Sequence, residues 1–394
     1  MQSGKIVVEN LYKVFGDKPQ EAMRLLKAGE TKETVFAKTG QVVGVNNVSF
    51  SVDEGEIFVL MGLSGSGKSS LIRLINRLMD PTDGRILLDG QDITRLSQPE
   101  LVALRRRDMS MVFQSFALMP HRSVLENAAF GLEIAGVGRK EREARALKVL
   151  EQVGLAPFAR KSPHELSGGM QQRVGLVRAL AVNPSLMLMD EAFSALDPLK
   201  RSEMQDILLD LQRGQSRTIF FVSHDLEEAL RIGTRIAIME GGRLVQVGTP
   251  QEIIENPADD YVRDFFKSVD TSRYLQAKDL IDPSAAGLVV NGNPANHAEL
   301  DKHSWVACVS KDHKLLGLVG RETLRSEGCI PSERCVPVSP VAPASCLPDV
   351  LQRLLGQTEP LPVTDGDGRY LGVITATSVL SKLSAHRLQS ASAH

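Results

Sequence analysis

The segment GLSGSGKS, Gly62 to Ser69, decides the fold of the chain around it. It follows a short apolar run, Ile57 to Met61 (IFVLM), that predicts a buried parallel strand. Helical apolar spacing begins at Ser69. A glycine-rich loop between a strand and a helix turns successive backbone N–H groups toward an anion at the helix N-terminus. The sequence therefore predicts a phosphate-binding loop in an α/β domain.

The residues of this loop have separate expected roles. The glycines let the backbone approach the phosphates, Lys68 brings a positive charge to the β- and γ-phosphates, and the Ser69 hydroxyl reaches Mg²⁺. The alternative is a simple glycine turn with a lysine there by chance. Such a turn would not need to lie between a strand and a helix, as this segment does. The predicted binding residues for ATP are Gly62, Ser64, Gly65, Ser66, Gly67, Lys68, Ser69 and Ser70.

A pair of acids closes a second apolar run, in SLMLMDEAFSALD, Ser185 to Asp197. Asp190 at the strand end is placed to hold Mg²⁺ or its waters, and Glu191 projects one residue further toward the γ-phosphate. We expect Glu191 to be the general base that orients the attacking water, because phosphoryl transfer depends mainly on positioning.

Two further polar residues follow strand-like runs. His224 comes after the apolar run Thr218 to Val222, and we expect it to contact the γ-phosphate and Glu191. Taken alone, it would be read as a capping or core histidine. Gln114 ends the run DMSMVFQ and is a candidate ligand for Mg²⁺ and the attacking water. The segment after Gln114, SFALMPHRSVLEN, has the apolar and basic residues of a contact surface for another subunit.

The segment LSGGMQQR, Leu166 to Arg173, predicts a second phosphate-binding helix start. Ser167, Gly168 and Gly169 form a nest of N–H groups at its N-terminus. In a compact parallel-sheet domain this segment lies too far from Lys68 for both to touch one nucleotide. A head-to-tail pair of chains would bring the two pieces together.

Taken in order, GLSGSGKS, Gln114, LSGGMQQR, LMLMDE, SALD and His224 resemble the ATP-binding subunits of ABC transporters, over residues 1 to about 267. The resemblance implies that two chains sandwich two ATP molecules, each between the phosphate loop of one chain and the LSGGM segment of the other. Ser167, Gly168, Gly169 and Gln171 would then bind the nucleotide of the second copy. Asp197, in the SALD loop, would signal across that interface.

A narrower resemblance is to the glycine betaine/proline (quaternary amine) import ATPases. It rests on MGLSGSGKSSLIRLINRLMDPTDG, MDEAFSALDPLKR and HDLEEALRIGTRIAIMEGGRLVQVGTPQEII. An insertion with helical spacing at Met23 and Leu26 separates Phe15-Gly16 from the run VGVNNVSF, as is typical of that group. Phe15 is the candidate for stacking on adenine, with a core role as its alternative and Phe36 as its competitor. The resemblance implies transmembrane permease subunits, a periplasmic or extracellular substrate-binding protein, and a peripheral place on the cytoplasmic face of the inner membrane.

Composition agrees with this interpretation. The 394 residues are 42% hydrophobic and 24% charged, as in a soluble globular protein with more than one domain. The net charge of −2 gives no indication of nucleic-acid binding. No apolar run approaches the length of a membrane span. The four cysteines lack CxxC spacing and are expected to be reduced structural thiols (Cys308, Cys329, Cys335 and Cys346).

The last third of the chain contains an internal repeat. VACVSKDHKLLGLVGRETL, Val306 to Leu324, aligns with LPVTDGDGRYLGVITATSV, Leu361 to Val379, at an offset of 55 residues. Each copy predicts two apolar strands around a polar turn, followed by a helix. The repeat resembles a paired CBS module, a β/α regulatory domain. Trp305 is expected to anchor the core of the first copy.

The resemblance to CBS modules implies an adenine-nucleotide site in which an aspartate follows a threonine by three residues. Here Ser378 follows Thr375 at that spacing, and Thr323 stands at the equivalent place in the first copy. Because a hydroxyl accepts a ribose hydrogen bond more weakly than a carboxylate, ordinary ATP or AMP sensing is disfavoured. A cyclic dinucleotide, or a response to ionic strength at an anionic membrane surface, stays open as the regulatory signal.

The predicted architecture is an α/β P-loop ABC ATPase domain with a mixed, mainly parallel sheet, followed by a tandem CBS domain. The expected boundaries are 1–268 for the ATPase, with a helical subdomain at about 115–182, 270–385 for the paired module, with copies at about 272–330 and 333–385, and 386–394 for a flexible tail. Uptake of glycine betaine or proline is the leading function. Import of choline, carnitine or trimethylamine oxide, and a soluble ABC ATPase with a sensor domain, remain alternatives.

Overall fold

The structure, a computed structural model, describes residues 4–113, 117–215, 217–267, 275–282, 287–290, 293–294, 305–320 and 335–391. The chain divides into two compact units, Met1–Phe265 and Phe266–His394. Within the described ranges, no helix combines the length and the apolar character needed to cross a bilayer.

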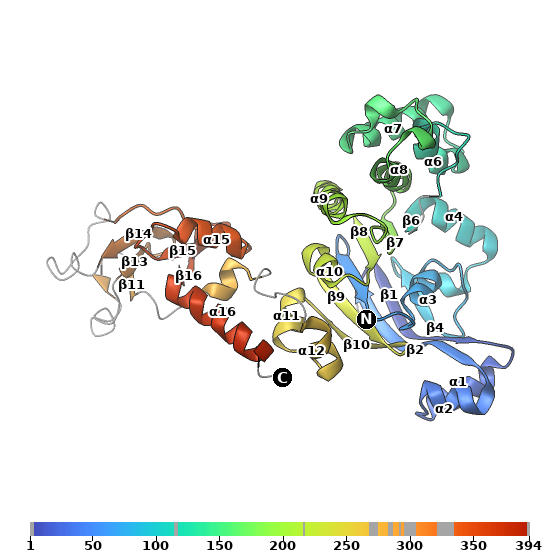
Figure 1. The fold of residues 1–394 in the computed structure, drawn as a ribbon, viewed down its shortest axis with the longest axis horizontal. Helices are drawn as coiled ribbons and strands as arrows, with labels where there is room; N and C mark the ends of the chain where they lie inside the picture. Colours follow the sequence, from blue (N-terminus) through green and yellow to red (C-terminus); the bar gives the residue numbers. More distant parts are fainter. Residues whose placement is uncertain are drawn as a thin grey trace. The chain divides into compact units, whose positions relative to one another are not determined.

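The first unit is built on a six-stranded sheet (Figure 1). Its central strand is β3 (Ile57–Met61), whose five residues are all buried and which pairs in parallel with a strand on each side. This confirms the parallel strand predicted before the glycine-rich loop. The remaining strands of the sheet are β6 (Met109–Phe113), β7 (Leu186–Asp190), β8 (Thr218–Val222), β9 (Arg235–Glu240) and the antiparallel edge strand β10 (Arg243–Gly248).

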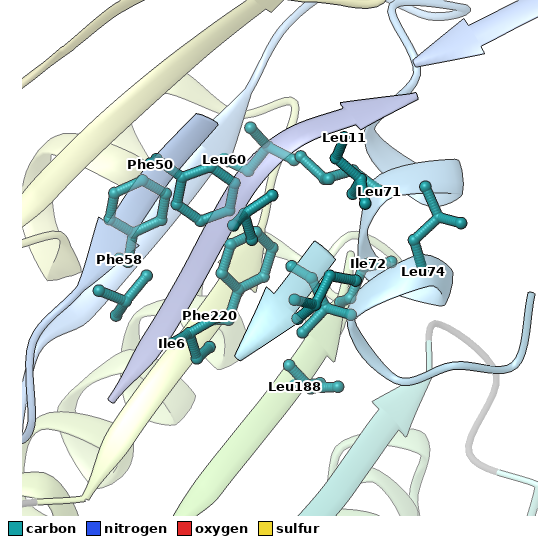
Figure 2. Close-up of a cluster of buried hydrophobic side chains, with 14 of the residues drawn as sticks. Ile6, Leu11, Phe50, Phe58, Leu60, Leu71, Ile72, Leu74, Leu188 and Phe220 are labelled. Carbon is teal, nitrogen blue, oxygen red and sulfur yellow. The ribbon is translucent and has the colours of Figure 1, made fainter. Parts of the chain in front are cut away.

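An antiparallel sheet covers one side of this core. Its strands, in spatial order, are β2 (Val42–Val52), β1 (Ile6–Phe15), β4 (Asp83–Leu88) and β5 (Gln91–Asp92). Phe58 of the central sheet stacks on Phe50 of β2 with ring centroids 5.1 Å apart, and on Phe220 of β8 at 5.6 Å. Figure 2 shows these rings together with apolar side chains of α3 (Lys68–Ile75). The phosphate loop is thus anchored at both ends in one continuous core.

Helices complete the first unit. A group in the middle of the sequence lies together at one end of this unit (Figure 1). It packs around its own apolar cluster, which includes Val124, Leu150 and Val174. Its members are α5 (Val124–Ala128), α6 (Phe130–Ile134), α7 (Arg139–Gln152) and α8 (Gly168–Ala181). The other helices that follow the core strands are α4 (Gln98–Asp108), α9 (Pro198–Gln215), α10 (Leu226–Ile232), α11 (Pro250–Glu255) and α12 (Asp260–Phe266).

The N-terminal insertion forms two short helices, α1 (Pro19–Lys27) and α2 (Lys32–Thr39). Met23 and Leu26 are buried, as their spacing predicts, in a small cluster with Tyr12 and Val14 of β1. The insertion therefore packs against the antiparallel sheet in a cluster separate from the central core.

The second unit contains two hairpins related by the predicted offset. Cys308 pairs with Gly317 in the first, and Val363 pairs with Gly372 in the second, each 55 residues on. The repeat of two apolar strands around a polar turn is confirmed. The hairpin strands are β13 (Trp305–Val309), β14 (Leu315–Gly320), β15 (Leu361–Thr364) and β16 (Tyr370–Ile374). The other elements are the short helix η5 (Ala277–Leu280), β11 (Gly287–Val290), β12 (Asn293–Pro294), α15 (Leu347–Leu354) and α16 (Ala376–Ala391).

The two hairpins contact each other through equivalent backbone atoms. The N–H of Tyr370 donates to the carbonyl of His313 at 2.9 Å, and the N–H of Leu315 donates to the carbonyl of Gly368 at 3.2 Å. Because these residues are related by the offset of the repeat, the copies are joined by a local two-fold arrangement. The helix expected after the first copy lies outside the described residues. The expected tail, 386–394, begins inside α16.

Strand segments are also exchanged between the copies. The start of the second copy pairs with the hairpin of the first copy, through two hydrogen bonds between Val336 and Leu318. The start of the first copy pairs with the hairpin of the second copy, where the N–H of Asp282 donates to the carbonyl of Val373. Each copy therefore adds a β-bridge to the hairpin of the other. Trp305 packs on the cluster of Ala307, Leu318 and Val373, which confirms its core role.

The cysteines are thiols wherever the structure describes them. Cys308, Cys335 and Cys346 are free, whereas Cys329 lies outside the described residues. Burial is the main cause that raises the pKa of Cys308 to about 12, so its thiol stays protonated and unreactive at neutral pH.

Candidate functional site

The phosphate loop joins β3 to α3 through glycines with positive φ. At Gly62 (φ +151°) a Cβ atom would lie 2.2 Å from the carbonyl oxygen of Met239, and at Gly67 (φ +104°) one would lie 2.3 Å from the carbonyl oxygen of Gly44. No side chain fits at either position, so the loop can take this path only with glycine. Lys68 begins α3 immediately afterwards.

Lys68 is buried under this loop. Its Nζ donates to the carbonyl oxygens of Gly62 at 2.8 Å and of Leu63 at 3.0 Å. Burial lowers the pKa of Lys68, and the charges of Glu191 and Asp190 oppose that shift. The ammonium thus lies beside both acids. Its position is fixed by its hydrogen bonds to the loop carbonyls of Gly62 and Leu63.

Two observations show that the loop suits a phosphate ligand. The hydroxyl oxygen of Ser66 is buried without a hydrogen-bond partner in the described structure. The start of α3 also presents free N–H groups, since Gly67 provides no side-chain cap. A bound anion would satisfy both kinds of donor.

Asp190 and Glu191 stand at the end of β7, as the sequence predicts. Burial is the main cause that raises the pKa of Asp190, followed by the charge of Glu191, while Arg73 and Lys68 act against the shift. A desolvated carboxylate of this kind gains from a divalent cation. Ser69 lines the adjoining cavity, so Ser69 and Asp190 are suited to Mg²⁺.

The backbone of Glu191 adopts the left-handed conformation, with φ of +48°. Its N–H donates to the carbonyl of Val222 at 3.0 Å, and its carbonyl accepts from the N–H of Ser194 at 3.2 Å and from the Ser194 hydroxyl at 3.0 Å. Such a conformation costs about 1 kcal/mol or more for a residue with a side chain, so it persists only where surrounding contacts impose it.

His224 reaches the same carboxylate. Its Nδ1 lies 3.2 Å from Oε2 of Glu191. The residues on either side of His224 are fixed by other contacts. The Ser223 hydroxyl donates to the buried carboxylate of Glu228, and Asp225 forms an ion pair with Arg201. Burial raises the pKa of Glu228, and the hydrogen bonds from Ser223 and Gln205 oppose that shift.

These side chains surround one cavity of about 470 Å³. It brings together phosphate-loop residues, Glu191 and His224, while β1 and β2 provide the rest of its wall. The lining residues are Phe15, Val42, Val43, Gly44, Ser64, Gly65, Gly67, Lys68, Ser69, Ser70, Glu191 and His224.

Phe15 forms the aromatic wall of this cavity. It is 36% exposed, and a Cβ atom on Gly44 would lie only 2.5 Å from its ring, so the ring lies directly on that backbone. The Nζ of Lys13 stands 5.4 Å from the ring centroid. Phe36 is more exposed, at 55%, but it belongs to α2 and is not part of the cavity wall. Gly44 is a wall residue that no motif of the sequence marks, although it stands in the VGVNNVSF run.

The LSGGM segment begins a helix, as predicted. Ser167 is the N-cap of α8, and its hydroxyl accepts from the N–H of Met170 at 3.4 Å. Nothing lies within 4 Å of the position that a Cβ on Gly168 would occupy, so this N-terminus is open. The amide of Gln171 instead donates to the backbone carbonyls of Pro163 and Leu166.

The structure does not bring these residues to the Lys68 cavity. Ser167, Gly168, Gly169 and Gln171 are absent from its wall, and so is Asp197. Asp197 forms an ion pair with Lys200 at 3.0 Å, and hydrogen bonding to the N–H of Lys200 is the first cause that lowers the pKa of Asp197. Gln114 lies outside the described residues.

A second, smaller cavity of about 310 Å³ lies in the second unit, between η5 and the start of α16. Ser378 is part of its wall, and its hydroxyl donates to the carbonyl of Leu280 at 2.9 Å. Thr375 and Ser378 also cap each other, since each backbone N–H donates to the other hydroxyl at 3.0 Å. Thr323 lies outside the described residues.

Comparisons with known proteins agree with this geometry. A family model described as ABC transporter matches residues 45–194. The chain is 47% identical over 393 residues to the glycine betaine/proline betaine transport system ATP-binding protein ProV of Salmonella typhimurium, covering 96% of this chain and 97% of that protein. It is 46% identical to the glycine betaine/carnitine transport ATP-binding protein GbuA of Listeria monocytogenes, covering 98% of each chain.

A solved structure is also similar to part of this chain. It is an ATP-binding cassette in a dimeric, post-hydrolysis state bound to ADP and Pi. The TM-score is 0.53 at 30% sequence identity, and the match covers 62% of this chain and 98% of the solved one.

Proposed function

This chain belongs to the ABC transporter family, as an importer subunit that hydrolyses ATP with Mg²⁺, and on that premise we propose that it drives the uptake of glycine betaine or a related quaternary amine. The observation that carries the proposal is the cavity in which Lys68, Glu191 and His224 meet, in a chain so similar to two glycine betaine transport subunits. Proline stands with glycine betaine in this leading proposal, and choline, carnitine and trimethylamine oxide are the competing substrates.

The residues around the cavity are assigned the following roles. Lys68 and the loop N–H groups bind the β- and γ-phosphates, and Phe15 stacks on adenine. Ser69, Asp190 and Gln114 hold Mg²⁺, which neutralises charge on the phosphates when bound. Glu191 accepts a hydrogen bond from the attacking water and orients it in line, and His224 supports that carboxylate and the γ-phosphate.

Two copies of the chain are needed to complete each site. The open N-terminus of α8 has the donors for a phosphate but lies outside the cavity wall of its own chain. A head-to-tail dimer would place Ser167, Gly168, Gly169 and Gln171 of one copy over the nucleotide of the other, with Asp197 at the interface. The solved relative is itself a dimer. The dimer docks on permease subunits at the cytoplasmic face of the inner membrane, and those permease subunits receive the substrate from a binding protein.

Transport by the reconstituted importer tests this function. The complex of this chain, permease and binding protein, placed in vesicles, is expected to accumulate labelled glycine betaine when ATP is supplied. Glu191→Gln should reduce hydrolysis by about 10²- to 10³-fold while ATP binding persists, because the substitution removes the base but keeps the shape of the side chain. Hydrolysis that is stimulated by none of the named amines would reject the substrate class.

The second unit is proposed to be a paired CBS module that regulates transport. The support is its exchange of strand segments between two equivalent hairpins, together with a cavity beside Ser378. Transport should be compared between the full chain and a version ending at residue 267, while salt is varied in vesicles that contain anionic lipid. Loss of the salt response on truncation would support regulation by ionic strength. An unchanged response would assign the module a different ligand, such as a cyclic dinucleotide.

A further inference from the structure

Glu191 needs help to keep its conformation. Its φ of +48° is unfavourable, and the peptide after it must stay in place for the carboxylate to face the cavity. The contacts to Val222 and Ser194 hold the N–H and the carbonyl of Glu191 itself. The carbonyl of Ala192 is the next backbone acceptor, and it is bound from a distant part of the chain.

Gln172 supplies that contact. Its Nε2 donates to the carbonyl oxygen of Ala192. The side chain is only 2% exposed, and its Oε1 is buried without a hydrogen-bond partner in the described structure. A buried amide with one atom unsatisfied carries a desolvation cost, which indicates that the bond through the other atom is worth keeping.

Gln172 lies on α8, the helix whose N-terminus starts with Gly168. A second contact joins the same two regions, because a Cβ on Gly169 would lie 2.9 Å from Cδ of Lys200, and Lys200 forms the ion pair with Asp197. The start of α8 and the segment after Glu191 therefore touch at two points.

We propose that Gln172 is a positioning residue that holds the general base, Glu191, in its active conformation and ties that conformation to α8. This inference rests on the proposed roles of Glu191 and of the LSGGM segment. In the head-to-tail dimer, the helix that caps the nucleotide of one copy is then hydrogen-bonded to Ala192, the residue after the base that acts on the nucleotide of the other copy. Closure of one site is thereby linked to the geometry of its neighbour.

Gln172→Met tests the proposal, since methionine fills a similar volume and cannot donate. In the complete importer, kcat for ATP hydrolysis should fall by about tenfold to a hundredfold with KM for ATP within about twofold of the original, because a base displaced by a fraction of an ångström loses orientation. Gln212→Met is the matched control. Gln212 also donates an amide hydrogen bond to a backbone carbonyl, that of Gly55, at 2.6 Å. The Gln212→Met variant should hydrolyse ATP at the original rate.

A second measurement separates positioning of the base from packing of α8. In the Glu191→Gln background, which is expected to trap ATP, adding Gln172→Met should leave the amount of occluded labelled ATP unchanged. Loss of occlusion would mean that Gln172 supports the LSGGM segment and would overturn the proposal, as would an unchanged kcat for Gln172→Met. If methionine disturbs folding, Gln172→Asn takes its place. Its shorter amide cannot reach Ala192, so it should give the same loss of kcat.

The Glu191→Gln variant by itself distinguishes a failure of this inference from a failure of the proposed function. If Glu191→Gln alone hydrolyses ATP at the normal rate, the role of the base is wrong. If Glu191→Gln is inactive while Gln172→Met is normal, only the inference about Gln172 fails.

Discussion

The phosphate loop of the first unit and the hairpins of the second use glycine in nearly the same backbone conformation for different purposes. Gly62 has φ of +151°, and Gly317 and Gly372 have φ of +155° and +153°. At Gly62 a Cβ would strike a carbonyl at 2.2 Å, and at Gly372 it would strike the side chain of Ile281 at 2.3 Å. The carbonyl of Gly62 accepts a hydrogen bond from the buried Lys68, on which the charges of Glu191 and Asp190 also act. A glycine with this φ therefore allows another group to approach the backbone closely. The charged groups nearby decide whether that group is a ligand or a neighbouring strand.

The largest expected difference between the two regions is in the effect on ATP hydrolysis of replacing a lysine. Lys68→Ala should reduce ATP hydrolysis by at least about a hundredfold, because the charge facing the phosphates is lost in a desolvated place. Lys314→Ala, at the exposed turn of the first hairpin, should leave the rate unchanged. Steady-state hydrolysis by both variants checks this contrast. A Lys68→Ala protein with normal turnover would contradict the assignment of the cavity.

The glycine contrast can be tested directly at Gly62. Gly62→Ala should weaken ATP binding and reduce hydrolysis by about tenfold or more, since the loop must move away from Met239 and its N–H groups lose their alignment. Binding of a fluorescent ATP analogue and turnover would be measured together. Gly65→Ala is a graded comparison. It has the same kind of strain, with φ of +79°, but no atom within 4 Å of its Cβ, so its loss should be smaller.

The corresponding change in the second unit should affect stability alone. Gly372→Ala is expected to destabilise that unit by about 1–3 kcal/mol, because Ile281 must shift and the residue is strained. Chemical unfolding of the full chain would show an earlier transition for this unit, with ATP hydrolysis unchanged. Gly366→Ala is the control, since nothing lies within 4 Å of its Cβ. Equal losses in the two variants would indicate that Gly372 packs less tightly than described.

The smallest expected effect is a pH dependence of the second unit. Burial raises the pKa of Tyr370 to about 12 from its ordinary value of 10.0, so the folded form keeps its proton more tightly than the unfolded form. Stability should then fall as pH rises from about 10 toward 12, by about 1–3 kcal/mol in total. Tyr370→Phe should flatten this profile in unfolding measurements at increasing pH. A profile unchanged by the substitution would assign the alkaline loss to another group, such as Cys308.

Much of the site followed from local sequence. The apolar run before Gly62, the acids that end β7 and the serine that caps α8 each depend on residues within a few positions of one another. The repeat in the second unit was also visible, because side chains 55 residues apart match. Such features are governed by propensity, capping and hydrophobic spacing, which act along a short stretch of chain.

Other features depended on contacts between distant residues. The choice of Phe15 over Phe36 as the wall of the cavity required the pairing of β1 with β2, which lays the ring on Gly44. The exchange of segments around Asp282 and Val336 could not be read from the alignment of the two copies, because matching sequences do not say which strand pairs with which.

By itself, the sequence determined the phosphate loop, the order of strands and helices around it, and the identity of the acids and the histidine that face it. Tertiary structure alone decided the left-handed backbone of Glu191 and the buried amide of Gln172 that holds the next peptide. The physical reason is that an unfavourable conformation of one residue persists only when contacts from elsewhere in the fold outweigh its cost, and those contacts exist only once the chain is packed.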